Sequence, residues 1–479
     1  MAIKKQETNY YKEGYRDGVA TVDVEVKRIW MYPKKPSGTF YNYRKIVSYL
    51  LLVILFTGPF LTIGGEPILM LNVLERKFVI LGQLFVPQDF HIFVIGMIIT
   101  VLFVVLFTVT FGRIWCGWTC PQTIFMEMVF RRIEYLIEGD ATAQRNLNNS
   151  PWTGEKIRKK TIKHIVFALI SFFIANMFLG YIVGGYNLIE MVTSSPLENW
   201  TVFVSLSIFT AIFYYVFAFF REQVCTSFCP YGRLQGVLLD KDSINISYDY
   251  VRGEPRGKLK KQPADDVLEE ALQGDCIDCN ACVRVCPTGI DIRNGTQMEC
   301  INCTACIDAC DEIMVKIDKP KGLIRYASEA EIEKGTKFKF TTRMYAYSGI
   351  LILLLGVLGY MLTSREIIET TILRAPGQMY QLTETGNVRN LYTIQVVNKS
   401  AEAMPLNLKL GAPKGELTLV KGALELKAAS MVDGAFFLEF AKSELSGFKT
   451  DVVVEVWSQG KKIEEVNTTF VGPRAENKK

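Results

Sequence analysis

Five uncharged apolar runs constrain this 479-residue chain more than any other feature of its sequence. Each is close to 20 residues long, which is the length that an α-helix needs to cross the hydrocarbon core of a bilayer. They therefore predict a membrane protein with five transmembrane helices and exclude a wholly soluble fold. The runs cover residues 46–65, 90–111, 164–184, 201–220 and 345–362.

The segment between the first two runs is also apolar, from Ile68 to Val86, but it does not read as a sixth span. Glu75, Arg76 and Lys77 interrupt it, and charged side chains are costly at the centre of a bilayer. We expect an interfacial or re-entrant segment here.

The basic residues predict how the chain is oriented. Residues 1–45 carry ten Lys and Arg and residues 113–163 carry nine, whereas residues 185–200 carry none. Basic loops stay in the cytoplasm, so the N-terminus is predicted to be cytoplasmic, and an odd number of spans sends the C-terminus outside. The first run acts as a signal anchor, because the long polar stretch before it does not resemble a cleavable signal peptide.

Eighteen further Lys and Arg lie in residues 221–343, between the fourth and fifth spans. This region is therefore also predicted to be cytoplasmic, and all twelve Cys of the chain face the reducing compartment or the inner edge of the membrane. The net charge of +5 is too small to indicate nucleic-acid binding. Only two His are present and no C-x-x-C-H motif occurs, which excludes attached haem or a pair of membrane haems.

Residues 366–479 change to short alternating strands separated by Gly, Asn, Pro and Lys. That pattern predicts a small β-sandwich. The region contains no Cys, so its apolar core must hold it together without disulfides, and we expect a spacer or docking module without chemistry of its own. The predicted strands include residues 392–397, 416–420, 436–440 and 451–456.

A cysteine pattern between the fourth and fifth spans carries the strongest chemical signal. The run C-x-x-C-x-x-C-x-x-x-C occurs twice, which is the spacing of bacterial two-cluster ferredoxins. In that pattern three thiolates of one loop hold a 4Fe-4S cluster and the remote fourth Cys holds the neighbouring cluster. We assign Cys276, Cys279, Cys282 and Cys310 to one cluster, and Cys300, Cys303, Cys306 and Cys286 to the other.

Other interpretations of these eight Cys are weaker. Disulfides do not form readily in a cytoplasmic loop, and zinc sites seldom use two consecutive four-Cys runs at this spacing. One departure from the ferredoxin pattern concerns the residue after the fourth Cys of each run. Pro287 follows Cys286, but Asp311 follows Cys310, so the Pro that usually turns the chain there occurs only once.

The remaining four Cys form a second repeat, C-x-x-x-C-P, once after the second span and once after the fourth. The motifs hold Cys116 with Cys120 and Cys225 with Cys229. Amphipathic segments follow at residues 121–137 and 230–239, and a Pro at the start of each suits the first turn of a helix. Cys120 and Cys229 are then expected at helix N-termini, where the helix dipole favours thiolate over thiol.

The matching positions suggest that a two-span unit is duplicated and that the four thiols lie around one pseudo-two-fold axis. A soft sulfur site of this kind suits Cu(I), a further cluster or a redox-active dithiol. Buried structural thiols at helix ends remain the alternative. His91 and His164 lie at opposite ends of their spans, so they cannot share a metal, and each is expected to be an interfacial residue.

With these motifs the chain resembles the cytochrome c oxidase accessory proteins called CcoG, FixG or RdxA over nearly its whole length. Together the motifs are far more specific than the ferredoxin spacing alone. Besides the paired cluster runs, the resemblance rests on Glu75-Arg-Lys-Phe, Pro87-Gln-Asp-Phe, Gly112-Arg-Ile-Trp-Cys-Gly-Trp-Thr-Cys-Pro-Gln-Thr, Cys229-Pro-Tyr-Gly-Arg, Arg252-Gly-Glu-Pro-Arg-Gly and Asn390-Leu-Tyr-Thr.

The resemblance implies a multidomain protein of the bacterial inner membrane that takes part in assembling a cbb-type oxidase. It further implies an oxidoreductase of the cupric reductase type, which reduces Cu(II) to Cu(I), with copper chaperones and oxidase assembly factors as partners. Cys116, Cys120, Cys225 and Cys229 are the motif positions best suited to a copper or relay site. The electron donor is not identified.

The expected organisation follows from these observations and from the resemblance. It comprises a cytoplasmic N-terminal segment (1–45), a four-span membrane region with both C-x-x-x-C-P motifs (46–240), a cytoplasmic ferredoxin-like 4Fe-4S domain (241–344), a fifth transmembrane helix (345–362) and a periplasmic immunoglobulin-like domain (366–479).

Two other functions fit parts of the sequence. A membrane quinol dehydrogenase feeding electrons to a periplasmic partner would also carry C-x-x-x-C-P and ferredoxin motifs, but is not expected to carry the β-sandwich after the fifth span. A non-catalytic assembly scaffold would use the clusters structurally and the outer domain for binding.

Overall fold

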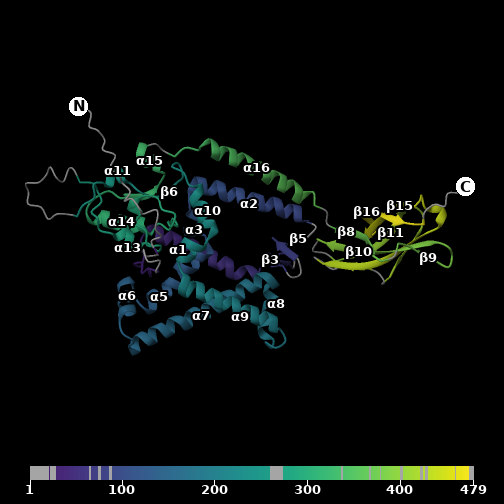
Figure 1. Cartoon of the computed structure of the whole chain (residues 1–479), viewed down its shortest axis with the longest axis horizontal. Coiled ribbons are helices and arrows are strands. Elements are labelled where there is room, and N and C mark those ends of the chain that lie inside the picture. Colours follow the sequence, from purple (N-terminus) through teal and green to yellow (C-terminus); the bar gives the residue numbers. More distant parts are fainter. Residues whose placement is uncertain are drawn as a thin grey trace, which may run out of the picture. The chain divides into compact units, whose positions relative to one another are not determined.

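The computed structural model describes Thr21 and residues 28–63, 66–73, 77–85, 89–258, 273–335, 338–365, 368–377, 379–399, 403–420, 424–426, 430–458 and 460–473. The chain forms two compact units. The first comprises residues 1–57, 94–179 and 190–358, and the second comprises residues 58–93, 180–189 and 359–479. Figure 1 shows both, with the elements labelled as below.

Five helices in the described part of the chain are long and apolar enough to cross a membrane, which confirms the expected number. The third begins ten residues before the apolar run does, because its first turns carry lysines that pair with carboxylates: Lys160 and Lys163 each lie 2.9 Å from Glu138. The helices are α1 (Thr39–Thr57, continued by the 3-10 turn Gly58–Phe60), α2 (Phe90–Phe111), α7 (Gly154–Val183), α9 (Trp200–Tyr215, continued by the π-helical η4, Val216–Phe220) and α16 (Thr342–Thr363).

The second unit contains the predicted β-sandwich. Its two sheets have the strand orders β12-β14-β10-β8, with β9 beside β10, and β13-β11-β15-β16. Alternate side chains of β10 and β14, among them Tyr392 and Phe436, are fully buried between the sheets. The strands are β8 (Ile368–Arg374), β9 (Gln381–Leu382), β10 (Val388–Asn398), β11 (Met404–Ala412), β12 (Glu416–Leu419), β13 (Leu424–Leu426), β14 (Met431–Phe440), β15 (Lys449–Ser458) and β16 (Lys461–Val471).

The stretch between α1 and α2, expected to be an interfacial or re-entrant segment, consists of strands in its described residues, and its position at the membrane stays a prediction. This stretch forms an antiparallel three-stranded sheet of β3 (Leu69–Asn72), β4 (Lys77–Ile80) and β5 (Gln83–Phe85), preceded by the short pair β1 (Thr62–Ile63) and β2 (Glu66–Pro67). Residues 74–76 and 86–88, which include parts of two motifs quoted above, lie outside the described residues.

The small sheet is explained by its burial pattern and by its contact within the second unit. Val79 and Leu84 are buried in one cluster with Val397 of β10, so these two side chains face a protein core, whereas Leu71, Val73, Ile80 and Leu81 are exposed. Leu81 and Gly82, both at positive φ, make the tight turn between β4 and β5.

Ion pairs connect distant segments of the second unit. Asp89, just before α2, is almost fully buried and lies 2.7 Å from the amine of Lys399, which follows β10. The guanidinium of Arg365, just after α16, donates to the same carboxylate. One carboxylate therefore joins the segment between α16 and the sandwich to the segment that precedes α2.

The other helices of the first unit are short. Helices α4 (Pro121–Ile124) and α10 (Pro230–Leu238) follow the two C-x-x-x-C-P motifs, and α13 (Ala281–Val285) and α14 (Ala305–Lys316) lie in the cysteine-rich domain. Strand β6 (Asn245–Tyr248) pairs with β7 (Ile324–Ala327) and closes that domain. The remaining helices are α3 (Ile114–Trp118), the π-helical η3 (Phe125–Phe130), α5 (Arg131–Ile137), α6 (Ala141–Asn149), α8 (Gly185–Thr193, shared between the units), the π-helical η5 (Val224–Phe228), α11 (Tyr250–Gly253), the 3-10 turn η6 (Ile292–Asn294) and α15 (Glu329–Lys334).

A buried network of charges holds α5 and α7 against the end of η4. The side chains of Arg131 and Arg221 are only 1% and 2% exposed. Arg221 lies 2.9 Å from Glu134, and Arg131 lies 3.5 Å from Glu222. The stretch after Pro121, expected to be a simple amphipathic segment, therefore buries charged as well as apolar side chains.

Removing one member of this network is expected to be costly, because its partner would remain charged and buried. We predict that Arg221→Ala lowers the free energy of unfolding by about 3–5 kcal/mol, measured by denaturant titration of the detergent-solubilised protein. Lys159→Ala is the control. Its partner Glu155 is 63% exposed, so a loss below about 1 kcal/mol is expected, and equal losses in both variants would contradict the prediction.

Candidate functional site

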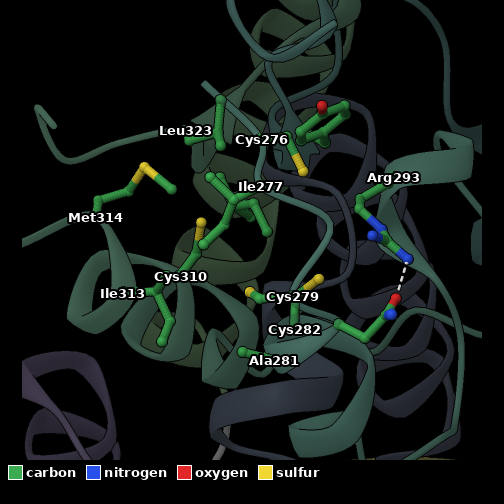
Figure 2. A pocket seen from close by; sticks show the side chains of 13 residues that line it. Cys276, Ile277, Cys279, Ala281, Cys282, Arg293, Cys310, Ile313, Met314 and Leu323 are labelled. Carbon is green, nitrogen blue, oxygen red and sulfur yellow. Dashed lines mark hydrogen bonds between the residues drawn. The ribbon is translucent and has the colours of Figure 1, made fainter. Parts of the chain in front are cut away.

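The first set of predicted cluster ligands lines one cavity. Cys276 and Cys279 lie in the loop before α13, Cys282 on α13 and Cys310 on α14. In Figure 2 their four sulfur atoms lie around one shared space, with Ile277, Ile313, Met314 and Leu323 closing its apolar side. The structure thus brings Cys310 to the loop of the other run, as the crossed assignment requires.

The second set lines a neighbouring cavity. Cys300, Cys303 and Cys306 meet Cys286 there, and Cys282 also contributes to the wall. Helix α13 connects the two cavities, because Cys282 lies within it and Cys286 directly follows its last residue.

The two cysteine loops repeat each other in their backbone as well as in their sequence. Asp278 and Asn280 of the first loop have φ of 51° and 56°, and Asn302 and Thr304 of the second have φ of 52° and 66°. These residues stand two and four places after the first Cys of each run. Asp and Asn accept this left-handed conformation more readily than most residues, and it coils each loop around its cavity.

The cysteines surround a space instead of converging on a point. Among the described residues, which include all twelve Cys, no three His, Cys, Asp or Glu side chains are arranged to hold a single metal ion. A tetrahedral zinc site would require sulfurs about 2.3 Å from one centre. Four thiols around an apolar cavity fit a group of several atoms, such as a 4Fe-4S cluster.

Burial disfavours the ionisation of these thiols in the absence of metal. It raises the pKa of Cys282 and Cys310 to about 12 and that of Cys303 to about 11. Metal thiolate ligands must lose their protons, so cluster insertion has to displace a proton at each of these positions.

Arg293, which the sequence did not single out, anchors the first loop. Its guanidinium lines the first cavity and lies 2.5 Å from Asp278 and 2.7 Å from Asp291. The hydrogen bonds that the Arg293 guanidinium donates to the Asp291 carboxylate are the main reason why the pKa of Arg293 is raised. A fixed positive charge beside four sulfurs favours the thiolate form of the ligands.

The C-x-x-x-C-P motifs form the expected helix starts. Cys120 is the N-cap of α4 and Cys229 is the N-cap of α10, each followed by Pro in the first turn. Burial, and then the neighbouring Cys120, Cys116 and Cys229, raises the pKa of Cys225 to about 12. The four thiols therefore lie close enough to influence one another, as the repeat predicted; the pseudo-two-fold axis stays a prediction.

A buried glutamine holds the first of these thiols. The Cys116 thiol donates to the Gln235 side-chain oxygen at 3.0 Å, and the Gln235 amide donates to the Thr108 hydroxyl at 3.1 Å. Gln235 lies on α10, directly after the second motif, and Thr108 lies on α2, directly before the first. Nothing in the sequence pattern distinguished Gln235 from an ordinary polar helix residue, because its role depends on how two distant segments pack.

The C-x-x-x-C-P cysteines lie against the second cysteine loop. Cys116 and Cys225 pack in one buried cluster with Cys303, Ile301 and Val285. Two cysteines of the C-x-x-x-C-P group therefore share a hydrophobic core with a predicted cluster ligand.

Gly117 makes a close backbone contact between these two regions. A Cβ atom at this position would lie 2.5 Å from the carbonyl oxygen of Ile301 and 2.7 Å from that of Asn302. The Gly117 carbonyl in turn accepts a hydrogen bond of 2.7 Å from the guanidinium of Arg44. Only a residue without a side chain fits here.

Gly117→Ala is accordingly expected to lower the stability of the first unit. Overpacking against rigid backbone costs about 1–3 kcal/mol, which should appear as a lower unfolding midpoint of the cluster-containing protein. Gly96→Ala on α2 is the matched control, because a Cβ there meets no atom within 4 Å. If both variants unfold at the midpoint of the parent, the loops do not pack as described.

Comparison with known proteins agrees with this geometry. Family descriptions of a 4Fe-4S dicluster domain match residues 220–329, those of a 4Fe-4S binding domain match residues 93–139, and those of an Ig-like fold at the C-terminus of FixG match residues 358–473. The chain is an iron-sulfur protein of the membrane with a C-terminal Ig-like domain.

Three relatives are similar over most of the chain. Protein RdxA of Cereibacter sphaeroides is 32% identical over 93% of this chain and 98% of its own length. Protein RdxB of the same organism is 36% identical over 80% of this chain and 82% of its own. The nitrogen fixation protein FixG of Rhizobium meliloti is 31% identical over 80% of this chain and 79% of its own. On this extent of identity the chain belongs to the FixG/RdxA family of iron-sulfur redox proteins.

Proposed function

We propose that this protein reduces Cu(II) to Cu(I) during the assembly of a cbb-type cytochrome c oxidase. The observation that supports it best is the shared packing of Cys116 and Cys225 with Cys303. A group of soft sulfur ligands thus lies directly beside a predicted redox centre.

The crossed ligand sets are part of this proposal. Cys276, Cys279, Cys282 and Cys310 would hold one 4Fe-4S cluster, and Cys286, Cys300, Cys303 and Cys306 the other. When bound, each cluster takes up and releases one electron at a time, which is what the reduction of one Cu(II) consumes. Arg293 fixes the first loop, and Arg44 and Gly117 fix the second loop against the thiols.

The C-x-x-x-C-P thiols would bind copper as the substrate. Thiolates prefer Cu(I) to Cu(II), so these ligands favour the reduced product. Cys116 is buried, whereas Cys120 and Cys229 are partly exposed, which gives the ion a side from which to enter. Because burial raises the pKa of Cys116 to about 11, copper must displace a proton there, and retention of Cu(I) is expected to weaken as the pH falls.

The membrane orientation completes the proposal. With the N-terminus in the cytoplasm of a bacterium and the five helices crossing the inner membrane, all twelve cysteines lie on the cytoplasmic side. The ferredoxin-like domain (241–344) would then be cytoplasmic and the Ig-like domain (366–479) periplasmic, where it would meet copper chaperones and oxidase assembly factors.

The sandwich favours this function over a quinol dehydrogenase that passes electrons to a periplasmic partner, because such an enzyme is not expected to carry that domain. Its presence after α16, and its match to the FixG description, support the assembly role. A purely structural scaffold would contain clusters that do not change oxidation state when copper is added.

Anaerobic analysis of iron, sulfide and copper with EPR tests the proposal. The purified protein is reduced with dithionite, freed of excess reductant and mixed with Cu(II). We expect the Cu(II) signal to disappear while the clusters are reoxidised, with one copper reduced for each electron lost. A Cu(II) signal that persists beside reduced clusters would overturn the assignment.

A further inference from the structure

A cavity that the proposed function does not use opens between α7 and α9, at the N-terminal end of α7. It is open on one side, where Trp152, Ile157 and Ile165 are each at least 50% exposed, and its volume is about 560 Å³. The wall combines apolar side chains with a few polar groups. It consists of Trp152, Ile157, Lys160, Thr161, His164, Ile165, Ala168 and Tyr214.

Two polar side chains meet at this cavity, one from each transmembrane helix. The Tyr214 hydroxyl lies 2.8 Å from the Nδ1 atom of His164. The His164 ring also stacks on Phe219, with ring centres 6.0 Å apart and planes 17° apart. Polar residues within membrane-spanning helices are expensive and therefore usually serve a function, and this pair is held in a fixed orientation.

The cavity wall continues into the buried charge network. Lys160 lies 2.9 Å from Glu138, and Lys163 lies 2.9 Å from Glu138 and 3.6 Å from Glu134. Glu134 pairs with Arg221, and the adjacent Glu222 accepts a backbone hydrogen bond from Cys225 through its carbonyl oxygen. A chain of ion pairs thus runs from Lys160 in the cavity wall to Arg221 and Glu222, and it ends three residues before Cys225.

The charges beside the cavity balance one another. Lys160 and Lys163 from α7 face Glu134 of α5 and Glu138, which directly follows α5, so two positive charges meet two negative ones. Burial alone would raise the pKa of Glu138, but Lys163 and Lys160 hold it below its ordinary value. A neutral ligand with hydrogen-bonding oxygens fits this wall better than an anionic lipid headgroup, which would need an unpaired cation.

We propose that this cavity binds a lipid-soluble quinone and that the corresponding quinol is the electron donor of the protein. The His164–Tyr214 pair would bind one ring oxygen and Lys160 the other, while Ile157 and Ile165 would lie along the ring and the start of the hydrocarbon tail. The inference rests on the proposed function only in that it requires the two 4Fe-4S clusters as electron acceptors.

The reaction balances with groups already named. Oxidation of one quinol breaks two O–H bonds and releases two electrons and two protons. The cysteines of the two cavities would hold one 4Fe-4S cluster each, and each cluster would take up one of the two electrons. His164 accepts one proton, and the other leaves to solvent through the open side of the cavity.

Binding can be tested without any activity. Quinones quench tryptophan fluorescence at short range, and Trp152 lines the cavity. Menadione titrated into the full-length protein in lipid nanodiscs is expected to quench part of the emission in a saturable manner, and Trp152→Phe should remove that part. Tyr214→Phe removes one hydrogen bond, worth about 1 kcal/mol, and should raise the dissociation constant roughly fivefold.

Electron donation is tested by adding menadiol to the oxidised, anaerobic protein and following the bleaching of the clusters. We expect bleaching by menadiol to slow at least tenfold in Tyr214→Phe and in His164→Gln, while dithionite still bleaches both variants as it does the parent. Tyr215→Phe is the matched control. Tyr215 is the next residue of α9, it is 52% exposed and it does not line the cavity, so this variant should behave like the parent.

The outcomes separate this inference from the proposed function. If menadiol bleaches Tyr214→Phe, His164→Gln and the parent at one rate, or if it bleaches none of them, the quinone site is overturned, although dithionite-reduced protein could still reduce Cu(II). Bound phospholipid that menadione does not displace, with unaltered fluorescence, would also overturn it and assign the cavity to a lipid. Saturable quenching that depends on Trp152, with menadiol bleaching that depends on Tyr214, supports the site even if copper is not the acceptor.

Discussion

The double variant Cys276→Ser with Cys310→Ser is expected to retain about half of the parent iron, because both residues belong to one crossed ligand set and the other cluster keeps all four of its ligands. Cys276→Ser with Cys286→Ser is expected to retain almost none, because it removes a ligand from each set. The cavities motivate this difference, since Cys310 lies with Cys276 and Cys286 lies with Cys300. Iron and acid-labile sulfide per chain, measured on anaerobically purified protein, give the answer.

These two double variants distinguish crossed ligation from sequential ligation, in which each run of four Cys would hold its own cluster. They do so more sharply than any single substitution does. Under sequential ligation their iron contents would be exchanged, because Cys276 and Cys286 would then share a cluster. Each double variant contains the same number of serines, so a general loss of stability would lower both equally. EPR of the reduced Cys276/Cys310 variant should show one isolated cluster without magnetic coupling to a second.

The second large effect concerns the thiols beside the second cavity. Cys116→Ser with Cys225→Ser is expected to keep iron and sulfide near the parent values but to slow the reduction of Cu(II) at least tenfold. These two sulfurs pack beside Cys303 but do not line either cavity, and a serine hydroxyl is a poor ligand for Cu(I). The measurement is the rate at which pre-reduced protein converts added Cu(II) to chelatable Cu(I).

Thr119→Ala provides the control within the first motif. Its hydroxyl donates to the Trp115 carbonyl and it is not a sulfur ligand, so copper reduction should proceed as in the parent. Copper reduction by the double variant at the parent rate would remove the thiols from the mechanism. A loss of iron in the same variant would instead show that these thiols support the clusters.

The parts of this architecture that could be predicted from the sequence are those specified by a clear pattern within a short stretch of residues. Five uncharged runs determined the helices. The repeated cysteine spacing grouped Cys310 with Cys276, and the two line one cavity, while ligation of a cluster there stays a prediction. The Pro after each C-x-x-x-C motif correctly marked a helix start. In each case the pattern alone is enough to indicate the local structure.

The parts that were missed depend on contacts between distant segments. Strands β3 to β5 are only three or four residues long, which is too short for alternation to stand out from an apolar run, and their burial depends on Val397 far along the chain. Gln235 and Tyr214 likewise acquire their roles only through partners on other helices. A pattern within one window of sequence contains no information about such partners.

The shared carboxylate of Asp89 has a consequence for the stability of the second unit. Arg365 and Lys399 both bind it, so three segments that are far apart in the sequence depend on one negative charge. Asp89→Asn should therefore weaken both contacts at once, a larger effect than the loss of either cation alone.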